Sequence, residues 1–160
     1  MAFNYPILIL PIRAIQALFS LIVLGVLAYA ANHWGGSSPS SINFLIFTSV
    51  WTLLALIYLI LAPARFPAYA HKYGILGAEF VTMVFWFAGF IALADHLSDI
   101  RCGSYAGRHW GPCRAGIAGD VFAAFEWVLF AVTTAIAALH AWNTRNDRST
   151  KSDSAMEIYV

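Results

Sequence analysis

Charged side chains are scarce in this chain of 160 residues, where Asp, Glu, Lys and Arg together make up 11%. A water-soluble domain of this length needs many more polar side chains to cover its surface. The formal net charge is only +1, which provides no basic field to attract nucleic acid. The composition therefore argues against a soluble domain and against a nucleic-acid partner.

The sequence also lacks the spaced motifs of enzyme active sites. It contains no phosphate-binding loop, no nucleophile elbow and no paired His-x-x-His ligands. Its five His residues are scattered along the chain, and its two Cys residues do not form a Cys-x-x-Cys redox pair. We therefore expect no enzymatic activity, no cofactor and no metal ion.

Long apolar runs are what the sequence has instead. Crossing roughly 30 Å of hydrocarbon takes about 20 helical residues, and four runs reach that length. They are approximately Ala14–Ala31, Ile42–Ala62, Ile75–Ala94 and Ala115–Trp142. Backbone amides in lipid need partners within their own segment, so each run is predicted to be a helix.

These runs predict an all-α membrane protein. Short connections require neighbouring helices to be antiparallel, so we expect a four-helix transmembrane bundle over residues 1–142. Residues 143–160 are polar and are predicted to form a disordered cytoplasmic tail. Ala28-Tyr29-Ala30 also fits a signal-peptide cleavage site. The late position of Arg13 and the length of the first run favour a retained helix.

The distribution of basic residues favours both chain ends on the cytoplasmic side. Lys and Arg are retained there. Six of them lie at Arg13, in the 63–74 connection and after Trp142, whereas three lie between His96 and Arg114. The predicted orientation is therefore N-in and C-in, with the connection between the third and fourth helices outside.

Cys102 and Cys113 both lie in that outer connection, where disulfides form and persist. A bridge would close a short glycine-rich loop and stabilise the fold by about 3 kcal/mol in the entropic model. Free thiols are one alternative. A metal site that adds His109 and His96 is another, although the spacing matches no standard zinc pattern.

Charged groups inside the apolar runs are costly, which makes them candidates for function. Arg13 and Glu79 lie at similar depth near the cytoplasmic ends of the first and third helices. We expect them to form an ion pair that fixes which helices are neighbours. Gln16, one turn deeper than Arg13, is predicted to add a hydrogen bond.

Two further acids lie in the fourth run. Glu126 is near its middle, where desolvation disfavours a charged carboxylate, so we expect a protonated or hydrogen-bonded side chain with Trp51 and Thr52 as partners. Asp120 is nearer the outer surface and is expected to reach water or Arg114. The two acids are about 120° apart around the helix, which disfavours a proton relay through both.

Small residues recur in the same run at Ala115, Gly119 and Ala123. Such rows allow helix backbones to approach closely in membranes. We expect this row to pack within the bundle, with a dimerisation face as the alternative.

The combined layout resembles a known family. It consists of four helices with cytoplasmic ends, a cysteine pair in the second outer loop and an acid in the third helix. The segment 124–130 of the fourth helix reads Ala-Phe-Glu-Trp-Val-Leu-Phe. Together these features resemble the small MARVEL-domain tetraspan proteins of filamentous fungi over Ile7 to Trp142. The matching positions are Glu79, Cys102, Cys113 and Glu126.

This resemblance implies a non-enzymatic protein of membrane organisation, membrane apposition or vesicle trafficking, in the plasma membrane or endomembrane vesicles. The implied partners are membrane lipids, together with other membrane proteins or further copies of the chain. One alternative is a small transporter, channel or proton-linked carrier that uses Glu79 and Glu126. A membrane enzyme with a site in the outer loop is a third, weaker alternative.

Overall fold

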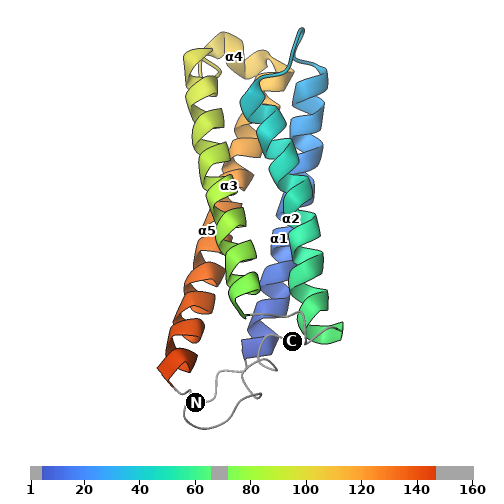
Figure 1. Ribbon diagram of the computed structural model, residues 1–160. Helices are drawn as coiled ribbons and strands as arrows, with labels where there is room; N and C mark the ends of the chain where they lie inside the picture. The colour runs from blue at the N-terminus through green and yellow to red at the C-terminus, as the bar shows by residue number, and fades with distance from the viewer. Residues whose placement is uncertain (1–4, 66–71, 147–160) are drawn as a thin grey trace.

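The computed structural model describes residues 5–65 and 72–146, and within them it contains helices and no strand. The long helices are α1 (Tyr5–Asn32), α2 (Ser40–Arg65), α3 (Lys72–Asp99) and α5 (Gly111–Asn146). A short helix, α4 (Tyr105–His109), lies between the last two (Figure 1). Each long helix contains a segment that is long and apolar enough to cross a membrane. The predicted all-α fold with four spans is confirmed.

The long helices extend beyond the apolar runs that predicted them. α1 begins at Tyr5 and continues through Pro11. α3 extends to Asp99, so the expected loop from His96 to Arg114 is partly helical. α5 begins at Gly111 and extends past Trp142 to Asn146. The added residues of α1 before Arg13 are themselves apolar, whereas α3 and α5 are extended at their ends by more polar turns. The rest of the predicted tail, 147–160, lies outside the described residues.

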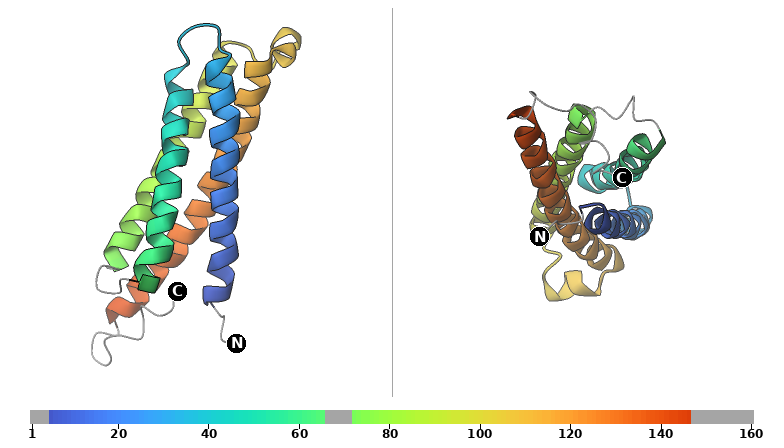
Figure 2. Two further views of the ribbon diagram at one scale, coloured as in Figure 1. Left: turned by 90° about the vertical axis from the view of Figure 1, so that its right-hand side faces the viewer. Right: turned by 90° about the horizontal axis from the view of Figure 1, so that it is seen from below.

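The four long helices form a closed bundle. α1 packs against α2, α2 against α3, α3 against α5, and α5 against α1, as the view from below shows (Figure 2). α1 and α3 therefore lie on one diagonal, and α2 and α5 on the other. The start of α1 and the end of α5 lie at one end of the bundle, and α4 lies at the opposite end. We refer to these as the Arg13 end and the disulfide end.

Buried positions recur with the same spacing along the helices. In α5 they include 116, 119, 123, 126, 130, 133 and 137, and in α1 they are 13, 16, 20, 23, 27 and 30. Steps of three and four residues average 3.5, which is the spacing of left-handed helix packing with knobs in holes. Each helix therefore contributes one regular row of side chains to a shared core.

The core differs in chemistry between its two ends. Toward the disulfide end it is mostly apolar, with Val23, Leu27, Leu45 and Leu93 fully buried. Toward the Arg13 end it is polar, and this polar half contains Arg13, Gln16, Ser20, Thr52, Glu79, Thr82, Glu126 and Thr133. Large apolar side chains such as Leu18, Leu54, Phe80 and Val128 face outward. The buried charged and amide side chains of the described spans thus gather inside one half of the bundle, whereas the buried hydroxyls of Ser41, Thr48 and Ser49 lie on the disulfide side of Thr52.

Gly119 allows α5 to approach α1 closely. A Cβ at this position would lie 2.5 Å from Leu27 Cδ2 and 2.9 Å from Leu27 Cγ, and Leu27 is fully buried. The buried row runs through Gly116, Gly119 and Ala123, whereas Ala115 is only half-buried. The predicted small-residue row therefore packs within the bundle, but its buried member before Gly119 is Gly116 and not Ala115.

We expect Gly119→Ala to destabilise the fold by about 1–3 kcal/mol, because the added methyl group overpacks the contact with Leu27. Gly25→Ala is the matched control, since a Cβ at Gly25 meets nothing within 4 Å. It should be neutral or stabilise the helix by up to about 1 kcal/mol. Equilibrium unfolding in mixed detergent micelles, followed by tryptophan fluorescence, compares the two. Equal effects would contradict close packing at Gly119.

Candidate functional site

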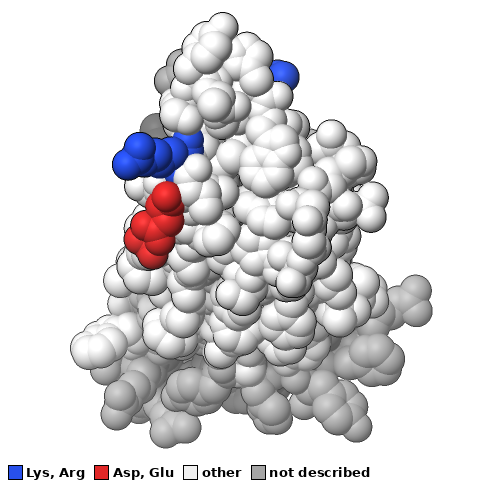
Figure 3. Space-filling model, turned by 90° about the horizontal axis from the view of Figure 1, so that it is seen from above, with Lys and Arg blue, Asp and Glu red and all other residues white. Residues whose placement is uncertain are grey.

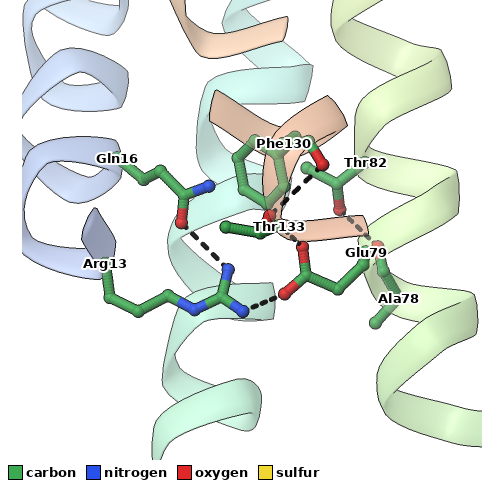
Figure 4. A network of polar contacts seen from close by, with 7 residues as sticks. All are labelled: Arg13, Gln16, Ala78, Glu79, Thr82, Phe130 and Thr133. Carbon is green, nitrogen blue, oxygen red and sulfur yellow. Dashed lines mark hydrogen bonds and ion pairs between the residues drawn. The ribbon is translucent and has the colours of Figure 1, made fainter. Parts of the chain in front are cut away.

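Arg13 and Glu79 form a buried ion pair across one diagonal of the bundle. Nη2 of Arg13 donates to Oε1 of Glu79, and the two residues are 5% and 0% exposed. The guanidinium group extends from α1 toward the carboxylate on α3 (Figure 4). The pair expected from the depths of the two residues is therefore present.

The second carboxylate oxygen of Glu79 and a second guanidinium nitrogen of Arg13 are hydrogen-bonded as well. Thr133 Oγ1 on α5 donates to Oε2 of Glu79 at 2.7 Å, and Arg13 Nη1 donates to Oε1 of Gln16 at 2.9 Å. We call Arg13, Gln16, Glu79 and Thr133 the Glu79 cluster. Both carboxylate oxygens are paired, and α1, α3 and α5 meet at this one group. Additional bonds of this kind offset the desolvation of a buried ion pair, so the cluster fixes how three helices are placed.

Glu126 is bonded to α1. Ser20 Oγ donates to Oε1 of Glu126 at 2.9 Å, and both residues are fully buried. The expectation that Trp51 and Thr52 of α2 are its partners is wrong. α5 packs mainly against α1 and α3, so α2 lies diagonally across the bundle from Glu126.

The two α2 side chains bond to α3 instead. Trp51 Nε1 donates to Thr82 Oγ1 at 3.1 Å, and Thr52 Oγ1 accepts from Trp86 Nε1 at 3.0 Å. Trp86 is fully buried, and its indole N–H needs a partner inside the bundle. Thr52 and Glu126 lie at comparable depth, but their helices are diagonal across the bundle, so the two side chains do not meet.

Asp120 is half-buried, and its Oδ1 has no hydrogen-bond partner among the described residues. Arg114 is exposed and forms no ion pair with Asp120 in the described part of the chain. Of the two expected alternatives, water or Arg114, the contact with Arg114 is therefore absent. Arg114 and Asp120 are six residues apart, so their side chains point about 120° apart around α5.

A disulfide joins Cys102 to Cys113, with their Cα atoms 5.4 Å apart. α3 ends in a Schellman turn, in which the N–H of Cys102 donates to Leu97 O and the N–H of Arg101 donates to Ser98 O, both at 3.0 Å. Arg101 takes the left-handed position of this motif with φ 55°. The turn places Cys102 beside the first turn of α5, which holds Cys113.

α4 is held against that turn. Ser104 Oγ accepts from the N–H of Gly107 at 3.3 Å, and a Cβ at Gly107 would lie 2.7 Å from Cys102 O. His109 Nδ1 lies 2.8 Å from the backbone oxygen of Tyr105.

The disulfide uses both sulfur atoms, so the alternative metal site with His96 and His109 lacks its thiolates. Among the described residues, no three His, Cys, Asp or Glu side chains gather to hold a metal.

A family comparison identifies this arrangement. The sequence profile of MARVEL, a membrane-associating domain, matches residues 6–136, which is most of the chain. The chain belongs to the MARVEL family. No curated protein and no solved structure matches it. The MARVEL match includes the whole polar half of the core, from Arg13 to Thr133.

Two residues of this MARVEL domain that donate to its buried acids escaped the sequence analysis, namely Ser20 and Thr133. A single hydroxyl in an apolar helix commonly bonds to its own backbone, so neither residue is conspicuous by itself. Their spacing provides the missing signal, because Ser20 lies four positions after Gln16 and Thr133 lies seven after Glu126. A 3.5-residue repeat drawn through the intramembrane polar residues predicts both.

Proposed function

We propose that this MARVEL protein is a non-enzymatic membrane organiser that acts in membrane apposition or vesicle trafficking. The observation that supports it best is the placement of side chains. Charged groups point inward, where Glu79 is paired with Arg13 and Thr133, and large apolar side chains face outward. A bundle of this kind presents a lipid-compatible surface of defined hydrophobic length. Lipids, other membrane proteins and further copies of the chain are its proposed partners.

Aromatic contacts between helices support the view that the bundle acts as one body. Phe19 on α1 contacts Phe122 on α5 with ring centroids 5.2 Å apart. Phe87 on α3 contacts Trp127 on α5 at 5.5 Å. Phe44 on α2 packs against Phe85 on α3 in an edge-on geometry. Such pairs add about 0.5–1.5 kcal/mol each beyond their buried area. Aromatic pairs therefore stabilise three of the four interfaces between neighbouring helices.

We also propose the N-in and C-in orientation, with the Arg13 end in the cytoplasm. The disulfide supports this orientation, since disulfides persist outside the cytosol. The disulfide end exposes few charges, as its space-filling view shows (Figure 3). Partners on that side would therefore contact a mostly uncharged surface. The fungal subgroup and a plasma-membrane or endomembrane location are further parts of the proposal, and they rest on the resemblance in layout.

Crosslinking with mass spectrometry in native membranes tests the proposed function. We expect reproducible crosslinks to other membrane proteins or between copies of this chain, and we expect the Glu126→Gln variant to retain them. The complementary measurement is flux into proteoliposomes. Saturable, substrate-specific flux that Glu126→Gln abolishes would overturn the proposal in favour of a carrier.

The carrier alternative is supported less well. A carrier that uses Glu79 must release that carboxylate during its cycle, yet both of its oxygens are paired, one with Arg13 and one with Thr133. Breaking a buried ion pair of this kind costs about 3–5 kcal/mol. Of the two acids that such a carrier would use, only Glu126 has a carboxyl oxygen without a hydrogen-bond partner in the described structure.

A further inference from the structure

Two polar atoms on fully buried side chains in the polar half of the core have no hydrogen-bond partner within the described residues. They are Nε2 of Gln16 and Oε2 of Glu126, and both side chains are 0% exposed. One is a hydrogen-bond donor and the other is a carboxyl oxygen. Buried polar atoms in native proteins are almost always paired with protein or with an ordered water molecule, so these two point to a bound polar ligand.

The orientation of the Gln16 amide is fixed by its neighbour. Arg13 Nη1 can only donate, and it lies 2.9 Å from Oε1 of Gln16. Reversing the amide would place its NH2 group against the guanidinium N–H, where neither could accept. The nitrogen must therefore be the end that turns away from Arg13 and into the bundle, as Figure 4 shows.

The two unpaired atoms belong to side chains in neighbouring layers of the contact between α1 and α5. Gln16 and Ser20 are neighbours in the buried row of α1, one turn apart, and a turn rises about 5.4 Å. Ser20 Oγ lies 2.9 Å from Oε1 of Glu126. Two hydrogen bonds in series through one oxygen atom span about 5 Å. Ser20 Oγ, whose proton is donated to Glu126, still has a lone pair with which to accept.

We infer that Gln16 Nε2, Ser20 Oγ and Glu126 Oε2 bind an internal water molecule. Water suits the site because it can accept from the amide and donate to the other two oxygens, and three polar partners are typical of buried waters. It can also accept from Glu126 if that carboxyl is protonated, so the site holds water in either state. The inference stands independently of the proposed function.

The surrounding side chains make this a closed site. Toward the disulfide end the core continues with Val23, Leu27 and Leu93, which are fully buried and apolar. Toward the Arg13 end lies the Glu79 cluster, with Arg13 and Glu79 as its charged groups. The water is therefore a structural ligand that joins α1 to α5, distinct from a pathway across the membrane.

Solid-state NMR of the full chain in lipid bilayers tests this site. The sequence contains only three Glu residues, at positions 79, 126 and 157, so ¹³C-glutamate labelling gives three side-chain carboxyl signals. The Glu126 signal is the one that Glu126→Gln removes. We expect magnetisation to pass from water protons to this carboxyl in the wild type, and to build up several-fold more slowly in Gln16→Leu and Gln16→Met.

Thr134→Val is the matched control, because Thr134 also has a buried hydroxyl without a hydrogen-bond partner in the described structure. It should leave the build-up at Glu126 unchanged. Absence of transfer to Glu126 in the wild type would overturn the inference whether or not the Gln16 variants fold. Equal build-up in wild type and in folded Gln16 variants, or equal slowing by Thr134→Val, would also overturn it.

Discussion

Arg13→Met should destabilise the protein by about 3–5 kcal/mol, because it leaves the Glu79 carboxylate buried without its counter-charge. Glu79 is fully buried, and its other hydrogen-bond donor is the hydroxyl of Thr133. A neutral hydroxyl cannot replace a guanidinium group. Gln16 would lose the donor to its amide oxygen in the same variant. This is the largest effect that we expect from a single substitution.

The double variant Arg13→Met with Glu79→Leu should recover most of that stability. Replacing both members of a buried ion pair with apolar residues is often neutral or stabilising, whereas removing one member is not. Thr133 could then donate to Phe130 O, from which its hydroxyl lies 3.2 Å. The difference between the single and double variants therefore isolates the buried charge from the loss of packing.

Equilibrium unfolding in mixed micelles of increasing dodecyl sulfate content measures these differences, with helix content read by circular dichroism. Arg114→Met is the control, since Arg114 is exposed and its substitution should change stability by less than about 0.5 kcal/mol. If Arg13→Met were as mild as Arg114→Met, or if the double variant were no more stable than Arg13→Met, the Glu79 cluster would not hold the helices together as described.

The double variant Cys102→Ser with Cys113→Ser should lower stability by about 3 kcal/mol through the greater freedom of the unfolded chain. The bridge joins the turn after α3 to the first turn of α5, so its loss should loosen α4 before the helices of the bundle. The same unfolding assay measures the effect on stability. Wild-type protein under reducing conditions should show the same loss as the double variant.

The oxidation state of these cysteines in intact cells also tests the proposed orientation. An impermeant maleimide should label Cys102 and Cys113 only after treatment with an impermeant reductant. No other Cys occurs in the chain, so the labelling is unambiguous. Labelling without the reductant would contradict the disulfide. Labelling that requires permeabilised cells would place the disulfide end in the cytoplasm and reverse the orientation.

The two-part core has a consequence for how these variants differ. The polar half contains the groups that specify the arrangement of helices, since α1, α3 and α5 meet at Glu79 and α1 meets α5 again at Glu126. The apolar half holds the helices through close packing, as at Gly119 against Leu27. Removing a buried partner therefore affects which helices are neighbours, whereas overpacking affects how closely they approach.

The sequence alone determined the number of spans and the depth of each polar residue. Lipid offers no hydrogen bonds to the backbone, so a long apolar run must be helical, and its position along the chain gives the depth of Arg13 and Glu79. The disulfide was predictable for a similar reason, because Cys102 and Cys113 share one short connection. Each of these features depends on distance along the chain or across the membrane.

Only the tertiary structure decided how each helix is rotated about its axis and which helices are neighbours. Thr52 and Glu126 lie at comparable depth, yet α2 and α5 are diagonal, and Ser20 of α1 takes the place expected for Thr52. The Arg13–Glu79 pair spans the other diagonal because a long guanidinium side chain can reach across the core. Hydropathy is nearly uniform around these helices, so rotation is set by side-chain packing and hydrogen bonding between segments far apart in the sequence.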